Sequence, residues 1–288
     1  MPSLRDLRDR IKSLKNTQQI TKAMKQVASA KIRRAELLQK QSRPYAEAMS
    51  EMLRDLISAV GTIDHPYMKP GKAGAPSGVI LMTADKGLAG SFNSNAISAA
   101  EEFRRGQPSG VVWYSVGVKG RNHVRRREAV EAYWPQSTGV KIDVAREIAT
   151  RVGEDFLAGK ISKIALVSQT LVSMMVQRPA ARELVPVTRE QSQEKSGPRT
   201  AVEFEPSPEA VLSRLLPKYL EFTIYSAMLE TDAAFFAAQL IAMSNATDNA
   251  GKLIDEITLE MNKARQAAIT KEILEIVGGA EALEGANA

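Results

Sequence analysis

The feature that most constrains the fold is an N-terminal segment with almost no helix-breaking residue. Residues 3–58 contain no glycine and a single proline, Pro44. This composition favours a continuous helix, which over residues 3–43 would be about 60 Å long at ~1.5 Å per residue. Proline removes a backbone donor and clashes with the preceding turn. We therefore expect Pro44 to kink or interrupt the helix near Arg43.

A second helix-forming segment lies at the C-terminal end. Between Pro217 and Val277 the single glycine is Gly251, so the composition predicts about 90 Å of further helix. Gly278 and Gly279 then predict its end. Small and apolar residues in this segment follow a 4-4-3-4-3-4 spacing, which is close to the heptad repeat of a coiled coil. They are Ala246, Ala250, Ile254, Ile257, Met261, Ala264 and Ala268.

The N-terminal segment carries an apolar seam of its own, with 3-4-3 spacing at its start. These first residues are Leu4, Leu7, Ile11 and Leu14. Ile20, Met24 and Val27 resume the spacing on a face rotated by about half a turn, at ~100° per residue. We therefore expect the contact surface to change around residues 15–19.

The two ends of the chain carry opposite net charges. Residues 1–43 hold twelve lysines and arginines against three acids, a net charge of +9. Residues 209–288 hold six basic residues against twelve acids, a net charge of −6. Opposite blocks favour an antiparallel pairing of two long helices. Because exposed ion pairs contribute only ~0–1 kcal/mol each, the charges would set register more than strength.

The middle of the chain alternates between strand-like and helix-like segments. Short runs rich in valine and isoleucine occur at 77–90, 109–120 and 161–170, and helix-like stretches at 91–106 and 141–159. This alternation predicts βαβ units and a mainly parallel sheet. The predicted fold class is α/β: a Rossmann-like domain together with a long antiparallel two-helix coiled coil.

We expect three parts along the chain. Residues 1–58 would form the N-terminal coiled-coil helix, residues 76–205 the α/β domain, and residues 209–288 the C-terminal coiled-coil helix. Residues 189–208 predict a loop with one short edge strand.

The chemistry available to the chain is narrow. It has no cysteine, which excludes disulfides and thiolate catalysis, and its two histidines, His65 and His123, lie far apart in polar surroundings. No Ser/His/Asp constellation or carboxylate pair stands out. We expect no catalytic residue, metal site or cofactor. No run reaches the ~20 apolar residues of a membrane span, and the charged residues near the start predict that there is no secretory signal.

Two motifs invite a ligand-binding interpretation. A glycine-rich turn follows an apolar strand at residues 83–93, but its spacing lacks both nucleotide-binding fingerprints, so it predicts a structural βα turn. Residues 117–127 are basic but lack interleaved aromatics, which predicts a solvated helix face or a protein-docking patch rather than a nucleic-acid site.

Four segments in collinear order resemble one known family. "RDRIKSLKNTQQITKAMKQVASAKIRRAE" (8–36) resembles the N-terminus of the gamma subunit of F-type ATP synthases, and "AMSNATDNAGKLIDEITLEMNKARQAAITKEILEIVGGAEAL" (242–283) its C-terminal signature. "DKGLAGSFN" (85–93) and "EPSPEAVLSRLLPKYLE" (205–221) resemble the family's middle segments. The resemblance covers essentially the whole chain.

The resemblance implies a non-catalytic rotor shaft. In the family the terminal helices form an antiparallel coiled coil inside a ring of α and β subunits, and the α/β domain binds the epsilon subunit and the c ring. Proton flow turns the c ring and the gamma subunit with it, while nucleotides bind to α and β. A surface poor in large apolar residues keeps contacts with the ring shallow, because burial stabilises by ~25 cal/mol per Å².

The resemblance also implies particular contact residues. Lys22, Met24 and Lys25 match a segment that faces an acidic loop of β. The second group, which matches a segment contacting a catch loop of the α/β ring, is Arg265, Gln266 and Thr270. Glu205 matches an acid on the side of the c ring and epsilon. Packing in the seam stays an alternative for Met24, and an ordinary surface acid an alternative for Glu205.

Departures from the family are few. Ala89 stands where a cysteine is usual, and Gln239 where many members carry an arginine, so the arginine's contact is not carried over. There is no cysteine-bearing insertion of the chloroplast type. Together with the expected absence of a mitochondrial presequence, the resemblance then implies a peripheral protein on the cytoplasmic face of a bacterial plasma membrane. A nucleotide-binding enzyme using the turn at 85–93 and a nucleic-acid-binding coiled coil are the alternative hypotheses.

Overall fold

The computed structural model of the protein describes residues 3–59, 65–136, 139–187, 205 and 207–286. By its internal contacts the chain forms two compact units. The terminal unit combines residues 1–27 with residues 240–288, and the central unit comprises residues 28–239. Both long helices contribute to both units. The division into three parts at 58, 76, 205 and 209 stays a prediction.

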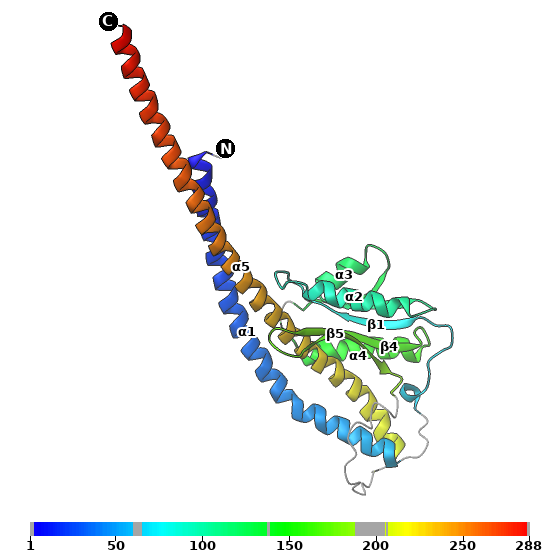
Figure 1. Ribbon diagram of the computed structural model, residues 1–288. Helices are drawn as coiled ribbons and strands as arrows, with labels where there is room; N and C mark the ends of the chain where they lie inside the picture. Colours follow the sequence, from blue (N-terminus) through cyan, green and yellow to red (C-terminus); the bar gives the residue numbers. More distant parts are fainter. Residues whose placement is uncertain (1–2, 60–64, 137–138, 188–204, 206, 287–288) are drawn as a thin grey trace. The chain divides into compact units, whose positions relative to one another are not determined.

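A five-stranded sheet among the described residues forms the middle of the central unit, with the strand order β3-β2-β1-β4-β5 (Figure 1). The strands are β1 (Ser77–Met82), β2 (Val111–Val116), β3 (Val130–Trp134), β4 (Lys163–Leu171) and β5 (Gln177–Val185). β1 pairs in parallel with β2 and β4, and β2 with β3, whereas β5 runs antiparallel to β4. The predicted α/β class with a mainly parallel sheet is confirmed.

Helices pack on both faces of this sheet. They are α2 (Phe92–Arg105) and α3 (Val118–Val124) on one face and α4 (Ile142–Leu157) on the other. Val79 and Leu81 of β1 belong to the apolar cluster with α2, and Ile80 and Met82 to the cluster with α4. Burial on both sides accounts for the continuous apolar run of this strand. The predicted helices at 91–106 and 141–159 are confirmed.

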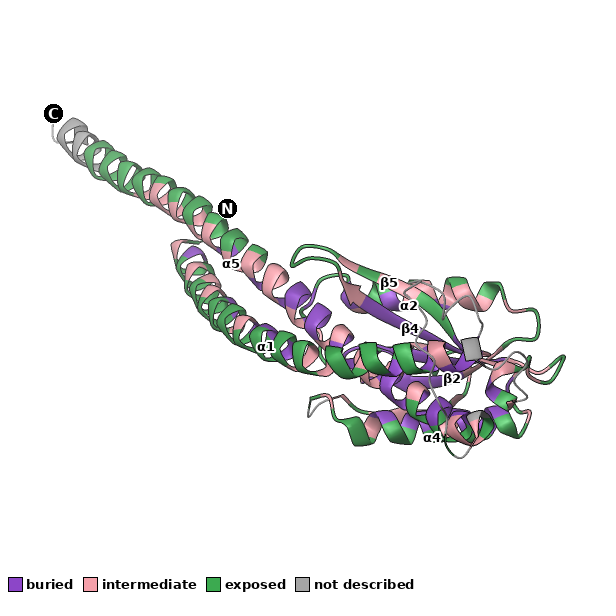
Figure 2. Cartoon of the chain, turned by 90° about the horizontal axis from the view of Figure 1, so that it is seen from below, coloured by how far each residue is buried: buried purple, intermediate pink, exposed green. Residues whose placement is uncertain are grey.

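The long terminal helices add a further layer to the core of the central unit. Leu53 and Leu56 of α1 (Leu4–Ala59) and Leu212 and Leu216 of α5 (Pro208–Ala286) belong to the same cluster as α4. Figure 2 shows that buried residues concentrate on the strands and on the adjoining part of α5. A short 3-10 helix, η1 (Pro66–Met68), buries Tyr67 against Phe156.

Neither long helix is interrupted where the sequence predicted a break, and the alternative of a kink near Pro44 stays a prediction. α1 continues through Pro44 without interruption, although its light-blue part curves in Figure 1. α5 continues through Gly278 and Gly279 to Ala286. An interior proline removes one helix hydrogen bond and costs about 3 kcal/mol, and each glycine costs about 1 kcal/mol relative to alanine. The remaining hydrogen bonds and packing of a long helix offset these local costs.

β3 and β5 are strands that the sequence analysis missed. Both lie at the edges of the sheet, where side chains are only partly buried and no long apolar run develops. β5 also contains Pro179, which edge strands tolerate. The predicted loop and edge strand at 189–208 lie almost wholly outside the described residues.

Candidate partner-binding site

In the terminal unit α1 and α5 lie side by side and run in opposite directions (Figure 1). Lys25 Nζ donates a hydrogen bond to Ser244 Oγ at 3.0 Å. Nearer the N-terminus, the hydroxyl oxygens of Thr21 and Thr247 lie 2.8 Å apart. Residue numbers fall along α1 as they rise along α5, so the predicted antiparallel pairing is confirmed.

The seam of α5 faces inward as its spacing predicts. Ala250 is buried and the other six predicted seam residues are half-buried, whereas Lys252 and Asp255 beside them are exposed. Gly251 lies close to α1, because a Cβ at this position would be 3.1 Å from Gln18 Nε2. The seam therefore brings the two helices close together while burying little apolar area.

The predicted change of face on α1 is wrong. Ile20 and Val27 are 60% and 54% exposed. Gln18 is half-buried and Thr21 is buried, so these polar residues continue the face that Leu14 begins. The apolar periodicity was misleading because hydroxyl contacts, here between Thr21 and Thr247, replace apolar packing at this level.

The opposite charges of the two helices do not form ion pairs at contact distance. Among the described residues of the terminal unit, no lysine or arginine of α1 lies within 4.0 Å of an acid of α5. The polar contacts that join the helices use hydroxyl groups instead. Most of the charged side chains therefore stay directed to solvent.

The first predicted contact group is accessible on α1. Lys22 and Lys25 are exposed, and Met24 is half-buried. Lys25 holds its ammonium group at the edge of the helix pair through Ser244. Partial burial of Met24 fits both the seam and the contact interpretation.

The second predicted contact group lies on α5. Arg265, Gln266 and Thr270 are exposed, and Thr270 Oγ1 donates to the Gln266 carbonyl oxygen at 2.9 Å. Arg265 lies 21 residues beyond Ser244, the partner of Lys25, which corresponds to about 30 Å of helix. The two groups therefore form separate surfaces along one helix pair.

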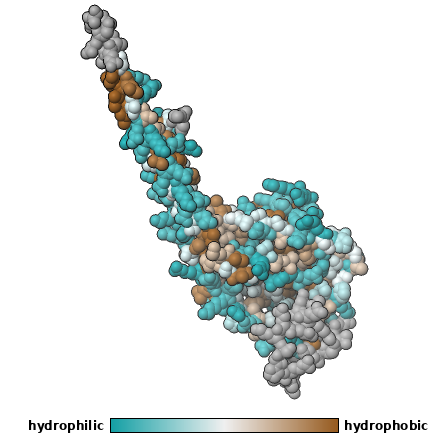
Figure 3. All heavy atoms as spheres, viewed as in Figure 1, coloured by the Kyte–Doolittle hydropathy of each residue, from teal (hydrophilic) through white to brown (hydrophobic). Residues whose placement is uncertain are grey.

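An exposed apolar segment near the end of α5 was not predicted. Figure 1 shows α5 continuing past the N-terminal end of α1, so the described part of α1 does not cover the last part of α5. Figure 3 shows apolar side chains gathered there. We call this segment the apolar tip; it consists of Ile269, Ile273, Leu274, Ile276 and Val277. The unequal lengths of the two predicted helices were the signal that could have revealed it.

Glu205, the remaining predicted contact residue, is exposed. It lies three residues before the start of α5 at Pro208, far along the chain from the other predicted contacts. Glu205 belongs to the central unit, whereas both groups belong to the terminal unit.

Comparison with known proteins places this architecture in a family. The family model described as ATP synthase matches residues 3–283. The ATP synthase gamma chain of Pelotomaculum thermopropionicum is 45% identical over 99% of this chain and 100% of its own length. That of Chlorobaculum tepidum is 39% identical with the same coverage. The chain belongs to the ATP synthase gamma-chain family.

Solved structures share the fold of this gamma-chain family member. A chain of the Euglena gracilis mitochondrial ATP synthase, in a structure of OSCP, F1 and c-ring, matches 99% of this chain with a TM-score of 0.71 and 18% identity. A chain of the Tetrahymena thermophila mitochondrial ATP synthase, in a structure of central stalk and c-ring, matches 79% with a TM-score of 0.58 and 24% identity. In the part of the chain that the structure describes, no helix is long and apolar enough to span a membrane.

The turn at residues 83–93 has a structural role in this family member. Asp85 accepts hydrogen bonds from the backbone amides of Val118 and Gln136, both at 2.9 Å. Asn93 Oδ1 accepts from the Ala84 amide at 2.9 Å. Ala89, which stands where a cysteine is usual, is buried in an apolar cluster with neighbouring residues. Asp85 and Asn93 therefore fix the backbone of this turn.

The basic segment at 117–127 is partly neutralised by nearby groups. His123 Nε2 lies 3.1 Å from Glu101 Oε1, and Arg127 lies 3.8 Å from the same oxygen. The Arg121 guanidinium lies over the Tyr133 ring at 4.5 Å. Burial raises the pKa of Glu101, but hydrogen bonds from His123 and Arg104 outweigh it and hold the pKa below its usual value. These contacts favour a solvated helix face.

Proposed function

We propose that the chain is the central-stalk rotor subunit of a bacterial proton-translocating F-type ATP synthase. It transmits torque between the membrane-embedded c ring and the catalytic hexamer of α and β subunits, and it is required for assembly and coupling. The full-length match to gamma chains carries this proposal, because 45% identity extends over the whole length of a relative.

The surface of the helix pair suits a shaft that turns against its partners. Long apolar side chains all round it would bury area at ~25 cal/mol per Å² and create deep energy wells at particular angles. Instead, charged and polar side chains cover most of its outer face, and small residues line its seam. Contacts with a surrounding ring would therefore stay shallow and hydrated.

The ring of α and β subunits would contact the shaft at two levels. Lys22 and Lys25, with Met24 between them, present positive charge and one apolar side chain to an acidic loop. About 30 Å further along α5, Arg265, Gln266 and Thr270 present hydrogen-bonding groups to a catch loop. Contacts at two separate levels would let the ring apply force to the helix pair at two points along its length.

The exposed apolar tip indicates that a partner covers the end of α5 in the complex. Exposed Ile273, Leu274 and Ile276 form more apolar surface than isolated surface residues would. An enclosing apolar collar formed by the α/β ring would remove this surface from water. Such a bearing centres the shaft without fixing its angle, since apolar contact is non-directional.

Glu205 is the proposed contact on the side of the c ring and the epsilon subunit. The alternative for this exposed residue is an ordinary surface acid. Catalysis resides in the partner subunits, and the chain itself needs no cofactor. We place it as a peripheral protein on the cytoplasmic face of the bacterial plasma membrane, held there through the complex.

The double variant Arg265→Ala/Gln266→Ala tests the proposed torque contact. Both side chains are exposed and outside the seam, so we expect the chain to fold and to copurify with α and β. ATP-driven proton pumping in reconstituted vesicles should fall several-fold for the same rate of ATP hydrolysis, because coupling rather than chemistry is weakened.

A matched control is Glu260→Ala/Lys263→Ala, which removes two exposed side chains from the same helix outside both groups. It should pump like the unmodified complex. Undiminished pumping by the Arg265/Gln266 variant would contradict the contact, and failure of the unmodified chain to assemble with α and β would contradict the function.

A further inference from the structure

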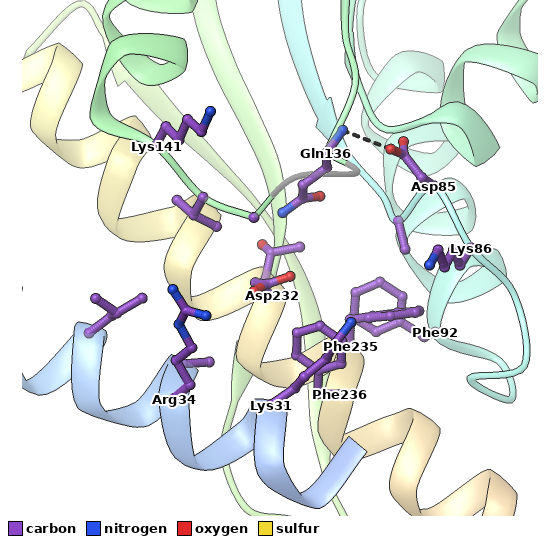
Figure 4. Close-up of a pocket in the computed structure, with 16 residues that line it drawn as sticks. Lys31, Arg34, Asp85, Lys86, Phe92, Gln136, Lys141, Asp232, Phe235 and Phe236 are labelled. Carbon is purple, nitrogen blue, oxygen red and sulfur yellow. Dashed lines mark hydrogen bonds between the residues drawn. The ribbon is translucent and has the colours of Figure 1, made fainter. Parts of the chain in front are cut away.

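A cavity of about 460 Å³ lies at the carboxyl-terminal edge of the parallel strands in the central unit. Figure 4 shows its walls: residues 84–86 after β1, Gln136 after β3, the residues just before α4, and α1 and α5 opposite them. In doubly wound sheets ligands bind in the crevice outside the carboxyl ends of the strands. Cavities of this size hold small organic ligands in other proteins.

Four cationic side chains line this cavity. Lys31 and Arg34 come from α1, Lys86 from the turn after β1, and Lys141 from the start of α4. None of the four forms an ion pair with a described acid. In Figure 4 Arg34 and Lys86 extend into the cavity region from opposite sides. The cavity therefore has positive charge that no described side chain neutralises at contact distance.

The backbone adds to this positive potential. α4 begins at Ile142, directly after the lining residues Val140 and Lys141. Lys141, the N-cap residue, makes no side-chain hydrogen bond to the first turn. The N-terminus of a helix carries a partial positive charge, which favours an anion nearby.

Of the two acids in the lining, one is already engaged. Asp85 accepts hydrogen bonds from two backbone amides. Asp232 on α5 accepts no hydrogen bond from any described residue, and burial raises its pKa to about 6, against the lowering effect of Lys31. The other charged groups that face Asp232 across the cavity are Arg34, Asp85, Lys86 and Lys141. A protonated Asp232 can donate a hydrogen bond to an anion, whereas an ionised one repels it.

We propose that this cavity binds a phosphate-bearing anion between Arg34 and Lys86, with Phe92 and Phe235 as its apolar wall. Bidentate guanidinium–phosphate contact and an ammonium point charge are the usual means of holding such a group. The site is assembled only in the whole chain, because α1 and α5 supply Arg34, Asp232 and Phe235. The inference is independent of the proposed rotor function.

Calorimetry on the full chain, with folding checked by circular dichroism, tests the site. The probes are pyrophosphate, inorganic phosphate and ATP in a phosphate-free buffer at pH 6. We expect saturable binding, tighter for pyrophosphate than for phosphate because more cations are engaged. If ATP binds more tightly than pyrophosphate, the phosphate belongs to a nucleotide. If ATP binds more weakly than pyrophosphate, the ligand is a free phosphate anion. No saturable binding of any of the three would overturn the proposal.

Two matched variants locate the anion. Arg34→Gln should weaken pyrophosphate binding about tenfold, the loss typical of one charge-assisted contact. Arg33→Gln removes the same charge from the adjacent exposed position outside the cavity and should leave binding unchanged. Equal weakening by both variants would show diffuse attraction to a basic helix and would overturn the site.

Asp232→Asn supplies an independent readout. It replaces an ionisable group by a neutral donor, so we expect pyrophosphate to bind the variant about tenfold more tightly than the unmodified chain at pH 8. At pH 5 the two should bind alike, because Asp232 is then protonated. The ligand's own protonation affects both proteins equally. An affinity at pH 8 that the substitution leaves unchanged would place the anion away from Asp232 and contradict the assignment.

Discussion

Burial disfavours the ionised form of the Asp232 carboxyl group. Burial raises its pKa from 3.8 to about 6, and the Lys31 ammonium group offsets this only partly. A carboxyl group with a raised pKa in the folded state favours folding only while it is protonated. The stability of the central unit therefore falls as pH rises from about 4 to about 6, and the loss stays constant at higher pH.

We predict that Asp232→Asn raises the free energy of unfolding by roughly 3 kcal/mol at pH 8, since one pKa unit corresponds to ~1.36 kcal/mol and the pKa is raised from 3.8 to about 6. The gain should shrink as pH falls from 6 to 4 and vanish below 4, where the carboxyl is neutral in both states. Urea unfolding of the full chain in a phosphate-free buffer measures it. Asp248→Asn, an exposed position on the same helix, should show no comparable gain.

Two helical glycines differ in what a methyl group would meet. At Gly251 a Cβ would lie 3.1 Å from the flexible end of Gln18. At Gly153 of α4 it would lie 2.3 Å from the hydroxyl oxygen of Tyr67, a buried ring packed against Phe156. The first neighbour can move aside and the second cannot.

We therefore predict opposite signs for the same substitution. Gly251→Ala should stabilise by about 0.5 kcal/mol, because alanine has the higher helix propensity. Gly153→Ala should destabilise by about 1–3 kcal/mol through overpacking. Thermal unfolding of each full-length variant measures both; a stable Gly153→Ala protein would show that Tyr67 is not confined.

At the scale of elements, the spacing of apolar residues predicted which face of each long helix is buried over part of its length. The seam from Ala246 to Ala268 and the first seam residues of α1 face inward because helical geometry alone fixes their spacing. The continuation of α1 through Gln18 and Thr21 was not predictable from apolar residues, since a cross-helix contact between Thr21 and Thr247 decides it. Short edge strands such as β3 likewise carry too little apolar pattern to identify.

The register of the helix pair gives a direct prediction. The chain has no cysteine, and the Thr21 and Thr247 hydroxyl oxygens lie 2.8 Å apart. Thr21→Cys/Thr247→Cys should therefore form a disulfide under mild oxidation, because the two side chains lie within reach of disulfide geometry. Mobility on a non-reducing gel detects it.

The control pair is Thr21→Cys/Thr258→Cys. Thr258 is half-buried on the same helix but lies eleven residues, or about 16 Å, beyond Thr247. It should not form an intramolecular disulfide. Cross-linking of the control pair in place of the first pair would show that the register is wrong.

At the scale of the whole molecule, the sequence predicted the family and the fold class but not the cavity. Arg34, Lys86 and Asp232 line the same cavity although they are far apart in the chain. No local motif links them, and they come together only because α1 and α5 lie beside the carboxyl edge of the sheet. The proposed contact groups on the helix pair could be named from the family resemblance, because each lies within one continuous segment of sequence.

Rotation of a single label in the assembled complex tests the central claim most directly. Ser109→Cys introduces the chain's one thiol at an exposed position of the central unit and allows specific attachment of a fluorophore. With the α/β ring fixed to a surface, we predict that the label turns in one direction and in discrete steps during ATP hydrolysis. A label that keeps a fixed angle while the same complex hydrolyses ATP would contradict the proposal that this chain is a rotor.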